Sequence, residues 1–71
     1  MPTFRDLFSQ AYLTPQEIST ETSIPLATVY ALRDGRPVEE RYMVRALRMV
    51  NSRLSASIQL QDLDAPRLLE R

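Results

Sequence analysis

Apolar residues recur at helical spacing along the chain, and helix-capping residues stand where the apolar stretches begin. Near the N-terminus the spacing between apolar positions is three, one, three and one residues, which matches one face of a helix. These positions are Phe4, Leu7, Phe8, Ala11 and Tyr12. Thr3 precedes them with Asp6 three positions later, as in a capping box. The pattern predicts a first helix from about Phe4 to Ala11.

The clearest helix start in the sequence comes next. Thr14 is a good N-cap, Pro15 suits the first helical position because its missing N–H needs no partner there, and Glu17 can bond back to the cap. We therefore expect a second helix from Pro15 to about Glu21, with Ile18 facing inward.

A short interruption separates this helix from a third one. Pro25 occupies either the first helical position or the one just before it. The residues that follow predict a helix from Leu26 to Arg33, which ends at Asp34 and Gly35. Gly35 is the only glycine in the chain, and it stands where a positive φ angle commonly ends a helix.

A longer amphipathic helix is predicted from about Val38 to Arg53, with glutamates in its first turn and arginines further along, as suits the helix dipole. Its inward face has the apolar residues Tyr42, Met43, Ala46, Leu47, Val50 and Leu54. Beyond it, apolar and polar residues alternate, which predicts an extended stretch over 56–59 and a short helical turn around Leu60–Leu63. Residues 64–66 can then start a helical tail over 67–70.

Composition excludes several kinds of active site. The 71 residues include no His and no Cys, so the usual zinc sites, thiol nucleophiles and Ser-His-Asp triads are excluded. No apolar run is long enough for a transmembrane helix or a signal peptide. We expect a cytoplasmic protein that is not an enzyme, binds no metal or other cofactor and does not enter a membrane, and no small-molecule effector is evident.

The charges are balanced overall but unevenly distributed. The chain contains nine arginines and nine acidic residues, yet residues 33–53 include six arginines and only three acidic residues, a local charge of +3. A basic middle on a neutral protein is a modest indication of a nucleic-acid partner. Its alternative explanation is a solvated helix face, which is the expectation for Arg45, Arg48 and Arg53.

The second and third predicted helices, with the short turn between them, form a helix-turn-helix pattern. The segments LTPQEIS at 13–19 and SIPLATVYALRDGRP at 23–37 resemble the lambda-repressor-like (Cro-type, xenobiotic-response-element-type) helix-turn-helix family. That family reads roughly L-T-Q-E-E-L-A and then G-V-S-R-S-T-I-S-R-I-E-N-G-K-R-x-P. The resemblance covers about residues 4–63. It implies an all-α, compact four- to five-helix domain over 1–63, with the helix-turn-helix at 14–34 and a C-terminal tail over 64–71.

The resemblance also implies a function and a set of contacts. The chain is then a sequence-specific regulator of transcription that binds double-stranded DNA, a repressor-type homodimer on a pseudo-palindromic site. Its base-reading residues are Pro25, Leu26, Ala27, Thr28 and Ala31. Its phosphate-binding residues are Thr14, Gln16, Tyr30, Arg33, Arg36 and Arg41. Its dimer contact, which we place on apolar residues of the C-terminal segment, consists of Ile58, Leu60, Leu63, Leu68 and Leu69.

The third helix departs from the family in a way that matters for recognition. Leu26, Ala27 and Ala31 stand where the family usually shows polar or arginine side chains, so hydrogen-bond readout of bases is thin. The alternative is a helix-turn-helix-shaped protein-interaction module, antitoxin-like or a regulatory adaptor, with weak or no DNA binding. Leu26, Ala27, Tyr30 and Ala31 then form a docking patch.

Overall fold

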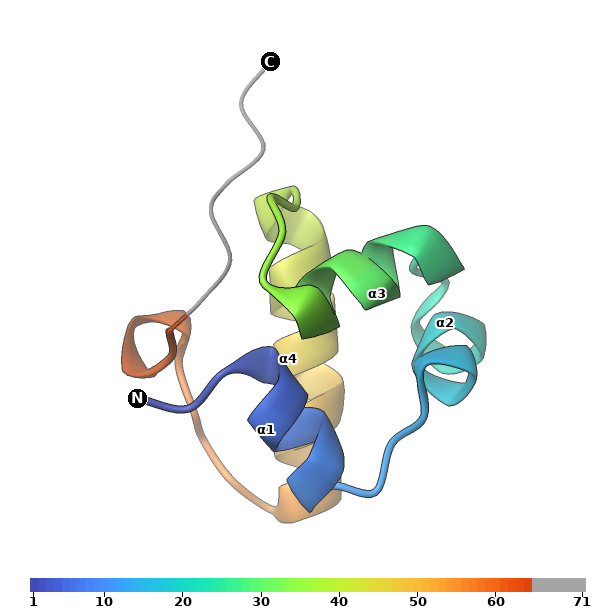
Figure 1. The fold of residues 1–71 in the computed structure, drawn as a ribbon. Coiled ribbons are helices and arrows are strands. Elements are labelled where there is room, and N and C mark those ends of the chain that lie inside the picture. The colour runs from blue at the N-terminus through green and yellow to red at the C-terminus, as the bar shows by residue number, and fades with distance from the viewer. Residues whose placement is uncertain (65–71) are drawn as a thin grey trace.

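The computed structural model describes residues 1–64, in which four α-helices and one short 3-10 helix enclose a single apolar core (Figure 1). The elements are α1 (Phe4–Gln10), α2 (Pro15–Thr22), α3 (Leu26–Asp34), α4 (Glu40–Leu54) and η1 (Leu60–Asp62). The fold is all-α, as the sequence predicts. None of the helices in residues 1–64 has the length and hydropathy needed to cross a bilayer.

The longest helix, α4, packs against α1, α2 and η1. α1 packs against α3 and α4, α2 packs against the same two helices, and η1 packs against α4 (Figure 1). Between them lies a core of fourteen buried side chains. These are Phe4, Leu7, Phe8, Leu13, Ile18, Ile24, Val29, Leu32, Val38, Met43, Ala46, Leu47, Val50 and Leu63.

The predicted helix starts are confirmed at α1 and α2. The Asp6 N–H donates to Thr3 Oγ1 at 3.2 Å and the Thr3 N–H donates to Asp6 Oδ2 at 3.0 Å, which completes the capping box. At α2, the Glu17 N–H donates to Thr14 Oγ1 at 3.2 Å. The Glu17 carboxylate does not bond back to the cap as expected, because it accepts a hydrogen bond from Arg53 of α4 instead.

The end of α3 is confirmed, whereas the start of α4 differs from the prediction. Gly35 follows α3 with φ of +74°, and Pro25 lies just before that helix as its N-cap. α4 begins at Glu40, two residues after the predicted start at Val38. Val38 is only 2% exposed, because the connector turns its side chain into the core before the helix begins.

The segment after α4 runs back along that helix. The Asn51 side-chain amide donates to the Ile58 carbonyl and accepts from the Ile58 N–H, both at 2.9 Å. This side chain therefore pairs with the backbone of the extended stretch in the way that a neighbouring strand would. η1 then confirms the predicted helical turn. The Asp64 N–H donates to the Pro2 carbonyl at 2.9 Å, which joins this segment to the N-terminus. The predicted tail helix over 67–70 lies outside the described residues.

Candidate functional site

Three residues join α2 to α3, and side-chain contacts fix their conformation. Ser23 has φ of 61° and its N–H donates to the Ser19 carbonyl at 3.0 Å. The Ser19 hydroxyl donates to the Ile24 carbonyl at 2.6 Å, and the Ile24 side chain is 1% exposed. The turn is therefore anchored on one side by a serine and on the other by the core.

Burial of the inner faces sets how α2 and α3 meet. Ile18 of α2 shares the core with Val29 and Leu32 of α3, and each of the three is at most 1% exposed. Because these apolar side chains occupy one side of each helix, the opposite side of α3 is left uncovered.

The five residues predicted to read bases lie on α3 or directly before it, and one of them, Ala31, also packs against the edge of the core. Pro25 and Ala27 are exposed, and Leu26, Thr28 and Ala31 are partly exposed. A shallow groove runs between α3 and the start of α4; it is lined by Ala27, Thr28, Ala31, Pro37, Val38, Glu39 and Tyr42. The groove therefore presents mainly methyl and methylene groups.

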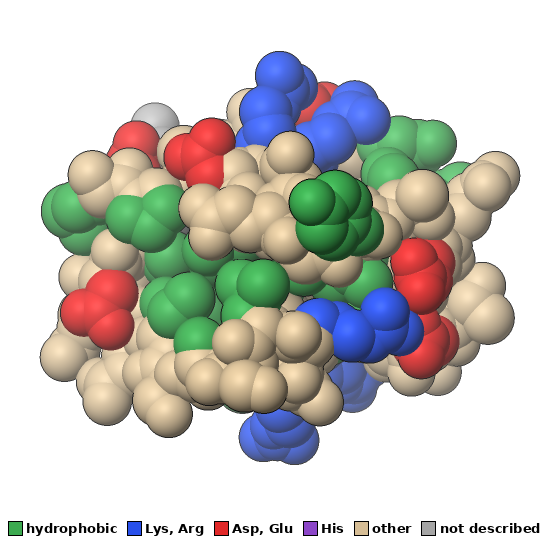
Figure 2. Space-filling model, turned by 90° about the horizontal axis from the view of Figure 1, so that it is seen from below, with side chains coloured by type: hydrophobic (Ala, Val, Ile, Leu, Met, Phe, Trp, Pro, Cys, Tyr) green, Lys and Arg blue, Asp and Glu red, His purple; other side chains and the backbone are tan. Residues whose placement is uncertain are grey.

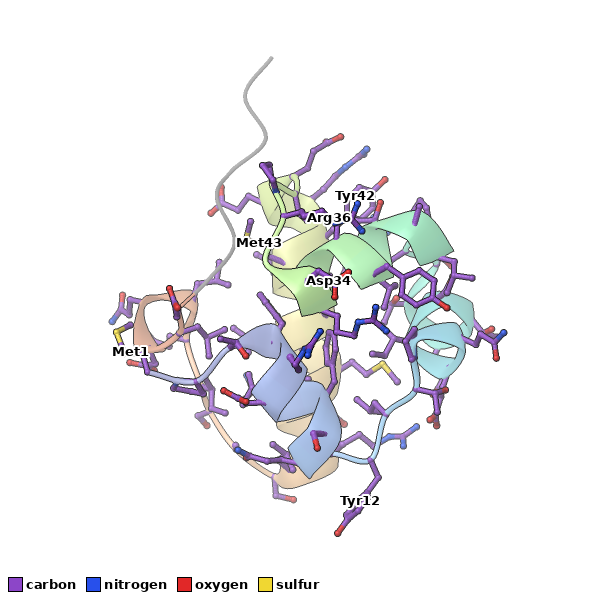
Figure 3. The ribbon with its side chains drawn as sticks, viewed as in Figure 1. Met1, Tyr12, Asp34, Arg36, Tyr42 and Met43 are labelled. Carbon is purple, nitrogen blue, oxygen red and sulfur yellow. The ribbon has the colours of Figure 1, made fainter. Side chains whose placement is uncertain are left out.

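Three arginines converge on one aspartate, Asp34, at the C-terminal end of α3. Asp34 and one of these arginines, Arg36, are labelled in Figure 3. Asp34 lies 3.0 Å from Arg33, 3.2 Å from Arg5 and 3.7 Å from Arg36. The hydrogen bond from Arg33 is the main cause that lowers the pKa of Asp34, and the charges of Arg33 and Arg36 and the hydrogen bond from Arg5 act in the same direction. Asp34 in turn raises the pKa of Arg33 through that hydrogen bond. Three positive charges on one negative charge leave this cluster at +2.

The sequence singled out Arg33 and Arg36 as phosphate-binding residues but missed Arg5. Arg5 lies on α1, 29 positions before Asp34, and helix packing alone brings the two together. No local spacing in the sequence signals that contact. Arg5 therefore joins the cluster as a residue that only the fold reveals.

The other predicted phosphate-binding side chains also have partners in the chain. Arg41 Nε lies 3.1 Å from Glu39 Oε2, and its guanidinium carbon lies 4.6 Å from the centre of the Tyr42 ring. Arg33 lies over the partly buried Tyr30 ring at 4.8 Å. All three predicted arginine clamps thus contact an acid of their own chain.

Thr14 and Gln16 lie at the first turn of α2, and both are exposed. Thr14 already accepts the capping hydrogen bond from Glu17. Its hydroxyl still has a proton to donate, because a hydroxyl can donate and accept at the same time. Both predicted residues are therefore accessible to a ligand at the start of α2.

The predicted dimer contact needs one correction. Leu63 is 4% exposed and belongs to the core of its own chain, so it offers no surface to a second copy. Ile58 and Leu60 are partly buried against that core, and Leu68 and Leu69 lie outside the described residues. Val44, which the sequence did not single out, is 39% exposed and borders a groove shared with Leu60.

The three arginines expected on a solvated face of α4 are all exposed, but one of them also forms ion pairs with α2. Arg53 Nη2 lies 2.9 Å from Glu21 and 3.3 Å from Glu17, so it connects α4 to α2 while the side chain stays exposed, as expected. Arg45 and Arg48 are exposed, as expected, and within residues 1–64 neither has an acidic partner. Arg45 lies near the Tyr42 ring at 5.6 Å.

The end of the molecule where α1 and α4 finish has a different character. Figure 2 shows hydrophobic side chains gathered in the middle of this end. Tyr12 projects from it, away from α3, and is 91% exposed with φ of 54° (Figure 3). The spacing that grouped Tyr12 with the inward residues of the first helix was misleading, because α1 ends at Gln10 and the turn directs the ring outward.

Comparisons with family models, with curated proteins and with solved structures find no match to this chain. Within residues 1–64, no group of acidic side chains has an arrangement that holds a metal ion. The outer face of α3 and the arginine cluster at its end are the two features from which a function can be argued.

Proposed function

We propose that this chain is a sequence-specific DNA-binding regulator of transcription with a lambda-repressor-like helix-turn-helix fold. The supporting observation is the pair α2 and α3, joined by a three-residue turn that Ile24 and Ser19 hold in place, with the outer side of α3 uncovered. In a helix-turn-helix, the second helix enters the major groove with its N-terminal residues at the base edges. Leu26, Ala27 and Thr28 occupy that position here.

The arginine cluster supplies contacts to the DNA backbone in this proposal. Arg5, Arg33 and Arg36 around Asp34 carry a net charge of +2 at the end of α3. A guanidinium has five N–H donors, so an arginine that pairs with one carboxylate keeps donors for a phosphate. Each phosphate contact releases counterions and therefore makes binding weaker as salt rises.

We further propose that the protein acts as a repressor-type homodimer on a pseudo-palindromic site. An α3 of nine residues offers few base contacts, and a two-fold pair doubles them. The two copies of α3 then lie about 34 Å apart, one turn of DNA. Within residues 1–64, we assign the dimer contact to Ile58 and Leu60 together with Val44. Such a regulator works in the cytoplasm of a bacterial cell.

One observation favours a second candidate, a protein-interaction module with weak or no DNA binding. Arg33, Arg36 and Arg41 each contact a carboxylate of their own chain, so a phosphate competes with Asp34 or Glu39 for them. The methyl-rich outer face of α3 then serves as the docking surface for a protein partner.

Titration of a labelled duplex, chosen by in vitro selection from a random pool, separates the two candidates. We expect Leu26→Glu and Ala27→Glu to abolish specific binding, because a carboxylate at the base edges has no partner except a cytosine amino group. Ser52→Glu is the matched control, since Ser52 is exposed on α4 and the substitution adds the same negative charge outside α3. If both variants on α3 bind as tightly as the parent, α3 does not enter the groove and the interaction module is favoured.

A salt series tests the backbone contacts in the same assay. Arg33→Ala and Arg36→Ala should weaken binding to every sequence similarly, and each should lower the magnitude of the salt slope by about one between about 50 and 200 mM salt. An unchanged slope in both variants would show that neither Arg33 nor Arg36 contacts the DNA backbone.

A further inference from the structure

We propose that the outer face of α3 recognises DNA sequence through the C5-methyl groups of thymine, and that its sites are therefore thymine-rich. This inference rests on the proposed function. It starts from the side chains that line the groove between α3 and the start of α4: Ala27, Thr28 and Ala31 on one wall, and Pro37 and Val38 on the other.

The arginines near this groove each contact a carboxylate of their own chain. Arg33 and Arg36 contact Asp34, and Arg41 contacts Glu39 and donates to the Tyr42 hydroxyl at 3.0 Å. Recognition of guanine takes two parallel N–H donors from one arginine. No arginine is among the residues that line the groove, so guanine is a poor ligand for this face.

The methyl groups of α3 match the one apolar feature of the major groove. Thymine presents a C5-methyl group beside its O4 acceptor, and alanine and the methyl group of threonine are typical contacts for it. Ala27 is exposed and Ala31 is partly exposed one turn later, so both face the same side of the helix. Two thymines on neighbouring base steps can thus be contacted by one copy of α3.

Thr28 adds one polar contact to this apolar surface. Its backbone N–H bonds to the Pro25 carbonyl at 2.9 Å, but within residues 1–64 its hydroxyl has no hydrogen-bond partner. It can donate to thymine O4 or adenine N7 next to a methyl contact. The three side chains together favour an A·T pair over a G·C pair.

Replacement of thymine by uracil tests the inference with the unaltered protein, because the two bases differ only in the C5-methyl group. A duplex obtained by in vitro selection is prepared with thymine and again with uracil at each thymine of a half-site. We expect thymine at two or more positions of the selected half-site, and about a fourfold loss of affinity for each contacted methyl that is removed, the equivalent of about 0.8 kcal/mol.

Variants locate the effect on α3. Ala27→Ser and Ala31→Ser replace a methyl group by a polar group and should bring the thymine-to-uracil affinity ratio towards one at a single position each. Ala56→Ser is the matched control, since Ala56 lies outside α3, and it should keep the full ratio.

Two outcomes overturn the inference: one leaves the proposed function intact, and the other refutes it as well. If a selected duplex binds equally well with thymine and with uracil, methyl recognition is refuted while DNA binding stands. If no duplex is enriched and none binds, the proposed function is refuted and the inference with it.

Discussion

Gly35 gives the sharpest test of how the local sequence fixes the end of α3. Its φ of +74° lies in the left-handed region, and a Cβ built at this position meets no atom within 4 Å. A substitution there is therefore strained by its backbone conformation alone, without any steric clash from neighbours. A non-glycine residue in this region costs about 1–2 kcal/mol.

We expect Gly35→Ala to lower the free energy of unfolding by about 1 kcal/mol, and Gly35→Val to lower it further because a β-branched residue fits a positive φ worst. For a domain of this size each kcal/mol corresponds to about 4–8 °C in melting temperature. Gly35→Asn should lose least, since asparagine tolerates the left-handed region. Thermal unfolding followed by circular dichroism measures all three.

Ser55 supplies the opposite substitution as a control. It ends α4 with φ of 52°, so Ser55→Gly relieves the same strain that Gly35→Ala introduces. We expect Ser55→Gly to lose no stability, although the added chain entropy of glycine offsets part of the gain. A melting temperature that is the same in Gly35→Val and in the parent would refute the assignment of a left-handed helix end.

Three further variants test the core, the ion pairs and the aspartate cluster. Ile24→Ala should lower the free energy of unfolding by about 2–5 kcal/mol in urea titrations, because Ile24 is 1% exposed in the turn. Arg53→Gln should cost at most about 1 kcal/mol, and no difference should remain at 1 M salt, because its ion pairs are partly exposed and screened. The pKa of Asp34 is lowered by Arg33, so its ion pairs add stability above the ordinary carboxyl range, which is lost as pH falls through that lowered pKa. Asp34→Asn should therefore lose less stability than the parent when acidified below about pH 4, and identical acid unfolding of the two proteins would contradict this.

The helix starts and the end of α3 could be predicted because their chemistry is local. Thr3 and Asp6 are three positions apart, as are Thr14 and Glu17, so each cap is determined within one turn. Gly35 acts through its own backbone angle. A sequence pattern contains all the information that such features need.

Features that depend on tertiary contacts, between residues far apart in the sequence, were predicted less well. An alternating pattern over 54–61 shows which residues share a face, but not whether that face meets the core or a second copy. Leu63, just beyond this pattern, lies in the core, although it was predicted to form part of a dimer contact. Val38 is likewise apolar enough for a helix face, yet it serves as a core residue of the connector.

The charges show the same limit with a direct consequence for function. The sequence places a local charge of +3 over residues 33–53, yet Arg53 is paired with two glutamates of α2 that lie 32 and 36 positions away. Conversely, Arg5 belongs to the acidic first part of the chain, yet its side chain pairs with Asp34 at the end of α3. In the folded chain, acids of α2 therefore offset positive charge at the C-terminal end of α4, whereas Arg5 increases the positive charge at the end of α3.

The position of that charge depends on how α3 ends. Gly35 turns the chain so that the Arg36 N–H donates to the Ala31 carbonyl at 2.9 Å, and this brings the Arg36 side chain back towards Asp34. A residue that resists the left-handed conformation would shift Arg36 while leaving Arg5 and Arg33 in place. Under the proposed function, Gly35→Val should therefore weaken binding to all DNA sequences at a temperature where the variant is still folded. The magnitude of its salt slope should decrease by about one, as in Arg36→Ala. A folded Gly35→Val variant with the parental salt slope would show that Arg36 does not contact phosphate through this turn.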